Sequence, residues 1–190
     1  MGQYYTPVIL GDLGQVKILK KEFIRVWLSS FCYGNGMKLM EHSYIGNKFV
    51  TAFESLICPD GAFYMSRAVW AGDYADPEPD CDDEKEQKNL YNMANEEEGL
   101  ACSKQQTPKA RDMSEFRYIV NHTKKLFVDK QLCSSGIHPL PLLICEGNGR
   151  GGGDYHGTNE HLCGTWARDV ISVERLEPET YTQLDCAFEE

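Results

Sequence analysis

The amino-acid sequence predicts an α+β fold: a mainly antiparallel sheet of six or seven strands with one or two packed helices and an acidic insertion. Three observations lead to this prediction. Short runs rich in β-branched and aromatic residues recur between glycine, proline and asparagine residues. One stretch has the three- and four-residue spacing of apolar side chains that is typical of an amphipathic helix. Acidic residues are concentrated in one segment.

The N-terminal part of the chain predicts two strands and a hairpin. Residues 3–10 form the first expected strand, and Pro7 favours an edge or bulged position because proline cannot donate a ladder hydrogen bond. Residues 23–28 form the second. Residues 33–36 contain glycine and asparagine, which tolerate the positive φ of a tight turn, so an extended run at 37–40 is expected to complete a hairpin.

The predicted helix begins after Asn47, whose side chain can cap it, and ends before the Pro59-Asp-Gly61 sequence. A strand at residues 64–71 is expected to follow. Apolar residues on one face of the helix are expected to pack against the sheet, namely Phe49, Val50, Phe53, Leu56 and Ile57.

The C-terminal half predicts further strands. Two alternating runs within residues 116–128 indicate a hairpin with His122 exposed at its turn. The apolar run 140–145 is interpreted as a buried central strand, with the prolines before it placed where no ladder donor is needed. Residues 170–173 suit a strand, and residues 176–190 form an acidic tail with helix potential.

The length of 190 residues predicts a single domain spanning residues 1–190, with residues 74–114 as a surface insertion within it. The sequence has neither a signal peptide nor a run of about 20 apolar residues, so a cytoplasmic protein without membrane association is expected. The eight cysteines lack Cys-x-x-Cys pairs, which favours free thiols over a disulfide framework.

The net charge of −10 is mostly local, because residues 73–98 contain eleven acids and two bases. The nearly neutral remainder has no basic stripe for broad nucleic-acid binding but leaves room for a small-anion site. The acids lack the glycine and the spaced glutamate of a calcium loop, so a solvated acidic surface is favoured over a metal site. A short helix is expected at residues 89–94 within this segment.

The stretch from Gly147 to Gly157 contains six glycines and is the expected ligand site. Glycine lets consecutive backbone N–H groups approach an anion, and Arg150 adds a planar two-pronged donor. The Gly-x-Gly-x-x-Gly pattern resembles a dinucleotide fingerprint, but no helix is expected after it, and no Gly-Lys-Ser/Thr completes a P-loop. A loop that needs glycine for its geometry alone is the alternative.

Aromatic and charged residues adjoin this stretch and the strand at 64–71. Aromatic rings that stack a base, beside arginines and carboxylates, are the components of a nucleotide pocket, although core packing explains each ring equally well. The predicted ligand-binding residues are Gly147, Asn148, Gly149, Arg150, Gly151, Gly152, Gly153, Asp154, Tyr155, Trp166, Arg168, Asp169, Trp70 and Asp73.

Titratable residues gather around the same stretch. A zinc site would need closely spaced ligand pairs, whereas His138, Asp154, His156, His161 and Cys163 are unevenly spaced, so neither a metal nor a cofactor is expected. Cys163 and His161 are also candidates for a nucleophile and its base, although two residues apart they need not touch. The candidate acids and bases of an enzyme are Glu146, Asp154, His156 and Asp169.

Several longer motifs run through the chain, including MGQYY, WAGDYAD, EGNGRGGGDYHG and GTWARD. With these motifs the chain resembles a family of uncharacterised proteins from bacteria and their phages, over most of its length. The resemblance implies no activity, cofactor or catalytic residue. By analogy alone, a phage setting implies a protein that counters host defence, acting in the host cytoplasm.

Three functions follow as hypotheses. The first is binding, with sequestration, of a small anionic ligand such as a nucleotide signal. The second is a hydrolase or transferase acting on such a ligand. The third is a protein-binding inhibitor whose acidic insertion docks on a basic protein partner. The sequence does not indicate the oligomeric state.

Overall fold

The computed structural model describes residues 3–10, 24–27, 38–78, 89–96, 111–133, 135–147 and 155–189 of the chain. The strands in these ranges are β1 (Tyr5–Leu10), β2 (Ile24–Trp27), β3 (Ser66–Gly72), β4 (Tyr118–Asn121), β5 (Leu126–Asp129), β6 (Cys145–Glu146), β7 (Val170–Glu174) and β8 (Thr182–Gln183). The helices are α1 (Leu39–His42), α2 (Lys48–Ile57), α3 (Leu90–Glu96) and α4 (Pro139–Ile144), with 3₁₀ turns η2 (Lys130–Leu132) and η4 (Glu160–Leu162).

The strands of the described residues form one sheet in the order β2-β1-β3-β7-β4-β5-β8, and β6 pairs with β3 outside this path. All pairs are antiparallel except β3–β6 and β5–β8. The prediction of an α+β fold with a mainly antiparallel sheet is therefore confirmed. Strand β3 is the centre of the arrangement, because it pairs with β1 along its length, with β7 near its start and with β6 near its end.

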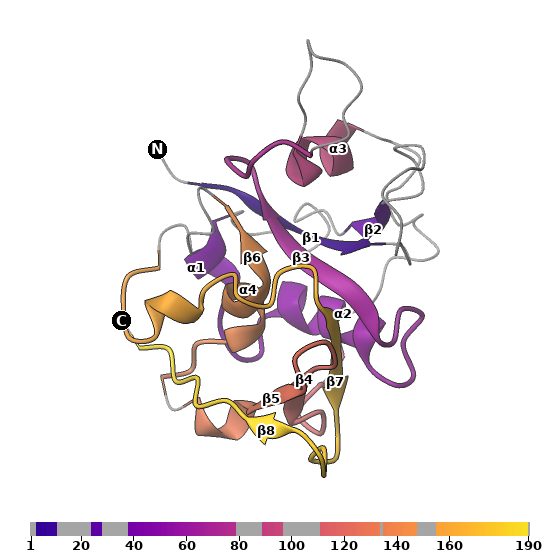
Figure 1. Cartoon of the computed structure of the whole chain (residues 1–190), viewed down its shortest axis with the longest axis vertical. Coiled ribbons are helices and arrows are strands. Elements are labelled where there is room, and N and C mark those ends of the chain that lie inside the picture. Colours follow the sequence, from indigo (N-terminus) through magenta and orange to yellow (C-terminus); the bar gives the residue numbers. More distant parts are fainter. Residues whose placement is uncertain are drawn as a thin grey trace.

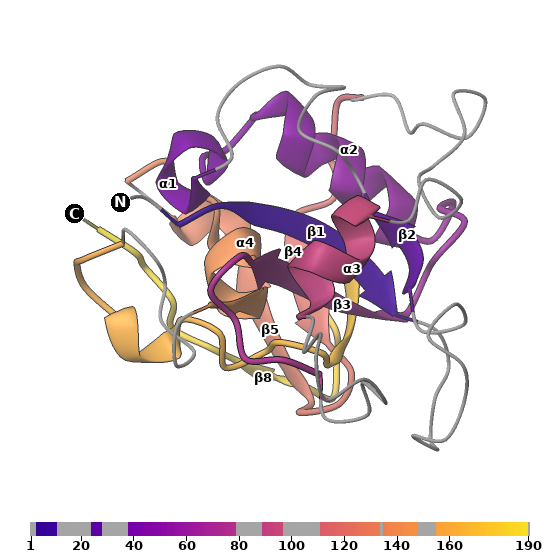
Figure 2. The same ribbon diagram turned by 90° about the horizontal axis from the view of Figure 1, so that it is seen from above.

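Helices cover both faces of the β1–β3 part of the sheet (Figures 1 and 2). On one face, α2 and α4 pack over Tyr5 and Ile9 of β1 and Trp70 of β3. On the other face, α3 packs over Val8 and Leu10 together with residues of β3. This explains why every residue of β1 is buried, although side chains alternate between the two faces of a strand.

Helix α2 confirms the clearest prediction from the sequence. The Asn47 side chain accepts hydrogen bonds from the backbone N–H groups of Phe49, at 2.8 Å, and Val50, at 3.3 Å, and so caps the helix. The predicted apolar face is buried, and each large apolar side chain removed from water contributes about 1.5–3 kcal/mol to folding. The helix ends at Ile57, directly before the predicted stop sequence.

Helix α4 corrects the prediction of a central strand at residues 140–145. Pro139 and Pro141 lie in the first turn, where backbone N–H groups have no partner inside a helix, so proline is tolerated there. The Nδ1 atom of His138 caps the turn by accepting a hydrogen bond from the Leu140 backbone N–H at 3.2 Å. All six helix residues are buried, and a helix that is apolar all round has no sequence period to distinguish it from a strand.

Two further predictions were wrong. The predicted extended run at 37–40 ends at Lys38, which bridges Tyr4, because residues 39–42 form α1. No helix forms in the described part of the tail, where β8 instead pairs with β5. Strand β1 is paired on both sides from Val8 to Leu10, and its pairing with β2 has a register shift between Ile9 and Leu10, so of the two alternatives predicted for this strand the bulged one is confirmed. The turn predicted at 33–36 lies outside the described residues.

The other predicted elements are confirmed. They are the strands at 23–28, 64–71 and 170–173, the hairpin within 116–128 and the short helix at 89–94. His122 does lie at the hairpin turn, but it is half-buried rather than exposed, with its Nε2 atom 2.8 Å from the Ser172 hydroxyl. All five cysteines in the described ranges are free thiols, and no helix there is long and apolar enough to cross a membrane.

His42 lies in the core beside the sheet, and its surroundings define the protonation state of its own ring. Its Nε2 atom accepts a hydrogen bond from the Trp70 indole Nε1–H at 2.8 Å, so the ring is neutral with its proton on Nδ1. Burial lowers the pKa of His42 to about 4. The imidazole therefore stays uncharged in the folded protein well below neutral pH.

We predict that this histidine makes the fold sensitive to acid. Between its ordinary pKa of 6.5 and its folded pKa of about 4, the unfolded chain binds the proton and the folded chain does not, so stability falls as the pH falls. From pH 7 to pH 5 the His42 contribution to the free energy of unfolding should drop by about 2 kcal/mol.

Urea unfolding at the two pH values measures this difference. The His42→Gln variant keeps an acceptor for Trp70 but cannot titrate, and it should lose about 2 kcal/mol less than the wild type on acidification. His156→Gln, at an exposed position, should behave like the wild type. An unchanged pH dependence in His42→Gln would contradict the assignment.

Candidate functional site

The glycine-rich stretch predicted as the ligand site lies mostly in residues 148–154, outside the described ranges. Gly147, at its start, is described. A Cβ atom at Gly147 would lie 2.4 Å from Nε2 of Gln3 and 2.5 Å from the Tyr5 hydroxyl, so a larger residue at this position would force these two side chains to move. Anion binding by the following backbone stays a prediction.

The predicted aromatic residues are core residues. Trp70 is 0% exposed, and Trp166 and Tyr155 are each 1% exposed. The Trp70 ring packs against Phe49 and Phe53, with ring centroids 5.7 and 5.2 Å away. In this structure none of these three rings offers a face on which a base could stack, so the expectation of stacking needs correction.

The charged residues predicted beside Trp166 are paired within the chain. The guanidinium of Arg168 donates to Glu146, with Nε 2.7 Å from Oε2, and to Glu78, with Nη2 2.5 Å from Oε1. Burial alone would lower the pKa of Arg168, but the two carboxylates outweigh it and raise this pKa. Asp169 forms an ion pair with Lys124. In the described residues these charged groups are therefore paired with one another.

The remaining predicted residues are dispersed. Asp73 accepts the backbone N–H of Tyr4 at 3.0 Å, at the end of β3. His156 and His161 are exposed, whereas Cys163 is buried. In the ranges that the structure describes, no three His, Cys, Asp or Glu side chains are grouped as metal ligands.

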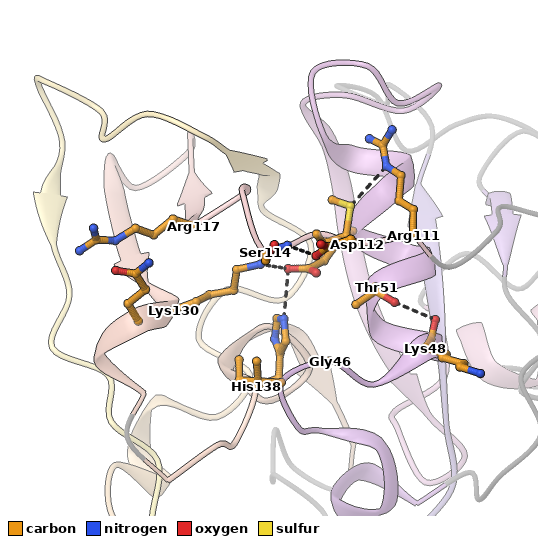
Figure 3. A pocket seen from close by; sticks show the side chains of 13 residues that line it. Gly46, Lys48, Thr51, Arg111, Asp112, Ser114, Arg117, Lys130 and His138 are labelled. Carbon is orange, nitrogen blue, oxygen red and sulfur yellow. Dashed lines mark hydrogen bonds and ion pairs between the residues drawn. The ribbon is translucent and has the colours of Figure 1, made fainter.

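A cavity of about 560 Å³ provides a different site, which the sequence did not indicate. It lies between α2, the segment 111–117 and the corner where β5 runs into η2 (Figure 3). Its volume is in the range of pockets for small molecules, about 300–1,000 Å³. It is lined by Ile45, Gly46, Lys48, Thr51, Glu54, Arg111, Asp112, Met113, Ser114, Arg117, Lys130, Gln131 and His138.

A buried carboxylate lies at the centre of this cavity wall. Glu54 is 1% exposed, and its Oε1 atom accepts hydrogen bonds from Nζ of Lys130 at 2.5 Å and from Nε2 of His138 at 3.1 Å. Figure 3 shows the Lys130 and His138 side chains converging from two sides. We call Glu54, Lys130 and His138 the buried triad.

The protonation state of the buried triad follows from its hydrogen bonds. Because Nδ1 of His138 accepts from the Leu140 N–H, the ring proton is on Nε2 and is donated to Glu54. Burial lowers the pKa of His138, so the imidazole is neutral at pH 7.

Glu54 is ionised. Burial alone would raise the pKa of Glu54, but its interactions with His138 and Lys130 outweigh burial and lower this pKa. Since His138 is neutral, we assign the lowering to the ammonium charge of Lys130 and to both hydrogen bonds. The triad is therefore a carboxylate–ammonium pair completed by a neutral imidazole.

A neighbouring ion pair holds Lys130 in place. The Asp129 carboxylate accepts a hydrogen bond from Nε of Arg117 at 2.6 Å and from the Gln131 backbone N–H at 3.0 Å. The second bond caps η2, the short turn that begins with Lys130. Lys130 thus extends from a fixed turn and is only 11% exposed along its side chain.

The cavity wall carries more basic than acidic residues. Lys48, Arg111, Arg117 and Lys130 line it, against Glu54 and Asp112, in a chain whose net charge is −10. Figure 3 shows that Lys48 and Arg117 extend away from the centre, whereas Lys130 points into it. The central cation is therefore Lys130, and the other bases form the rim.

Two hydrogen-bonding positions of the buried triad face no described partner. Both hydrogen bonds of Glu54 to described residues end on Oε1, which leaves Oε2 as an acceptor. To the residues that the structure describes, the Lys130 ammonium makes one hydrogen bond, although it carries three N–H donors. The site thus offers one anionic acceptor and one cationic donor side by side.

Sequence reasoning missed the buried triad because its members are far apart. Lys130 and His138 follow Glu54 by 76 and 84 residues. One signal was present: Glu54 lies between Phe53 and Leu56 on the apolar side of a predicted helix, where a carboxylate needs a buried partner. For His138 the sequence suggests no role beyond that of a candidate metal ligand.

Comparison of the chain with protein-family models, curated proteins and solved structures gives no match.

We predict that Lys130 balances the buried charge of Glu54. The Lys130→Met variant leaves an ionised carboxylate buried without its cation, and the free energy of unfolding at pH 7 should fall by roughly 3–5 kcal/mol. The double variant Lys130→Met/Glu54→Gln removes the charge as well and should recover part of this loss. Urea unfolding measures each value.

Lys124→Met is the matched control, because Lys124 forms an ion pair with Asp169 in which the lysine is 41% exposed. This variant should lose about 1 kcal/mol or less. If Lys130→Met/Glu54→Gln is as unstable as Lys130→Met alone, Lys130 does not act by balancing the charge of Glu54.

Proposed function

We propose that this protein binds a small anionic molecule in the cavity beside the buried triad. The observation that carries the proposal is the excess of basic residues around a cavity of about 560 Å³ in a chain of net charge −10. Inside a cavity, an anion gains more from a lysine or arginine than it would at an open surface, because less water screens the charges.

The chemistry of the cavity supports a ligand with two different groups. An anionic group is expected to take the remaining N–H donors of Lys130, and the bases of the rim attract it over a longer distance. A neighbouring hydroxyl or amino group is expected to donate to Oε2 of Glu54. A nucleotide has both, in its phosphate and in its ribose or base, so a nucleotide is the ligand class that we propose.

Sequestration of a nucleotide signal is the biological role that we attach to this binding. It draws on the resemblance to bacterial and phage proteins, with a cytoplasmic location that would be the host cytoplasm for a phage protein. Two locations compete for the ligand: the cavity, and the glycine-rich stretch with Arg150. The experiment therefore includes variants of both.

A hydrolase or transferase is the second candidate. One observation favours it: an ionised Glu54 lies beside a neutral imidazole at the cavity, and a carboxylate in this state can accept a proton from a bound hydroxyl or water. Recovering the ligand after incubation with excess protein and heat release separates the two functions. Intact ligand indicates sequestration, and converted ligand indicates catalysis.

Isothermal titration calorimetry with a panel of linear and cyclic nucleotides tests the binding site. We predict that Arg111→Ala/Lys48→Ala weakens binding of the best nucleotide about tenfold, since two positive charges are removed from the rim of the cavity. The control Arg175→Ala/Lys38→Ala removes the same charges at residues that do not line the cavity and should change the Kd by less than about twofold.

The remaining outcomes are also informative. A loss of binding in Arg150→Ala with normal binding in the cavity variant would place the ligand at the glycine-rich stretch instead. No heat with any nucleotide at high micromolar concentration would remove the nucleotide proposal. A partner that binds only at low salt and is lost on deletion of residues 76–110 would favour the acidic segment as a protein interface.

A further inference from the structure

Two cysteines meet at the base of the glycine-rich stretch. Cys145 follows α4 directly, and Cys163 follows η4. The backbone brings them together, because the N–H groups of Gly164 and Trp166 donate to the carbonyls of Leu142 and Leu143, each at 2.8 Å. Seventeen residues separate the two cysteines along the chain, and they include every glycine from Gly147 to Gly157.

The side chains of the two cysteines are in contact. Both are free thiols, and a hydrogen bond joins one thiol to the other. The Cys145 sulfur also lies 3.1 Å from the Leu142 carbonyl, which fixes the direction of its side chain. Cys145 is 0% exposed and Cys163 is 6% exposed, so Cys163 is the thiol that a small reagent reaches first.

The shared hydrogen bond also makes the two thiols unequal. The interaction with Cys145 lowers the pKa of Cys163, and this effect exceeds that of burial. The same hydrogen bond, together with burial, raises the pKa of Cys145. The thiolate is the reactive form of cysteine, so Cys163 is also the better nucleophile.

We propose that Cys145 and Cys163 form a redox pair, which a peroxide oxidises to a disulfide across the base of the glycine-rich stretch. The Cys163 thiolate attacks one peroxide oxygen, the O–O bond breaks, and Cys163 becomes a sulfenic acid while the other oxygen leaves as hydroxide and takes up a proton as water. The Cys145 sulfur then displaces the sulfenic oxygen, which leaves as a second water. Two thiols lose two electrons, and one peroxide gains them.

The other described thiols lack this arrangement. The Cys133 sulfur donates a weak hydrogen bond to the carbonyl oxygen of Cys186, at 3.9 Å. Burial raises the pKa of Cys133 to about 11 and also raises that of Cys186. Cys58 is buried beside the Arg111 guanidinium, 2.7 Å from Nη2. Selective reaction at Cys145 and Cys163 is thus expected.

Peroxide treatment of the folded full-length chain tests the pair. After hydrogen peroxide, remaining thiols are alkylated, and the digest is analysed by mass spectrometry. We expect the peptides that contain Cys145 and Cys163 to be joined, with loss of the link after reduction by dithiothreitol. Alkylation of both residues after peroxide, or a link from either one to another cysteine, would overturn the proposal.

Variants identify the order of the steps. Cys163→Ser should abolish the link, whereas Cys145→Ser should leave a sulfenic acid at Cys163 that dimedone traps. Cys133→Ser is the matched control and should give the same link as the wild type. The same peroxide reaction of the wild type is also run in urea. If the fold brings Cys145 and Cys163 together, the unfolded chain should lose the preference for a disulfide between them. An equal preference in urea would contradict a role for the structure.

Discussion

A carboxylate buried in the core constrains how the helices of this protein pack. Glu54 is ionised on the inner side of α2, and an unpaired charge at such a position would cost several kcal/mol. Its partners come from the end of β5 and from the residue that caps α4. Three elements that are distant in the sequence are thereby brought to one point, and the cavity forms beside them.

The cavity and the core share the same residues in different roles. His138 both caps α4 through Nδ1 and supports Glu54 through Nε2, so one imidazole fixes a helix start and a buried carboxylate. Asp129 likewise caps η2 and binds Arg117. A site built on caps of this kind is held rigidly, because moving its side chains would also open helix ends.

The sequence predicted the elements whose local pattern is unambiguous. Helix α2 has a cap and a regular apolar spacing, and the β4–β5 hairpin has alternating residues around a polar turn. Helix α4 lacks this regular spacing, because an apolar run with prolines carries no period, and its cap is a histidine rather than one of the common capping residues. The site was harder to predict: composition drew attention to glycines and tryptophans, whereas the buried triad depends on contacts across 76 and 84 residues that no local pattern encodes.

The Arg168 side chain links two stretches that are far apart in the sequence. Arg168 adopts a left-handed backbone conformation, with φ of 67°, and its guanidinium binds both Glu78, within the acidic segment 73–98, and Glu146, which directly precedes the glycine-rich stretch. One counter-ion thus serves two carboxylates. By thermodynamic linkage, any event that draws Glu78 away from Arg168 changes the free energy of the Glu146 contact, and a change at Glu146 acts on Glu78 by the same amount.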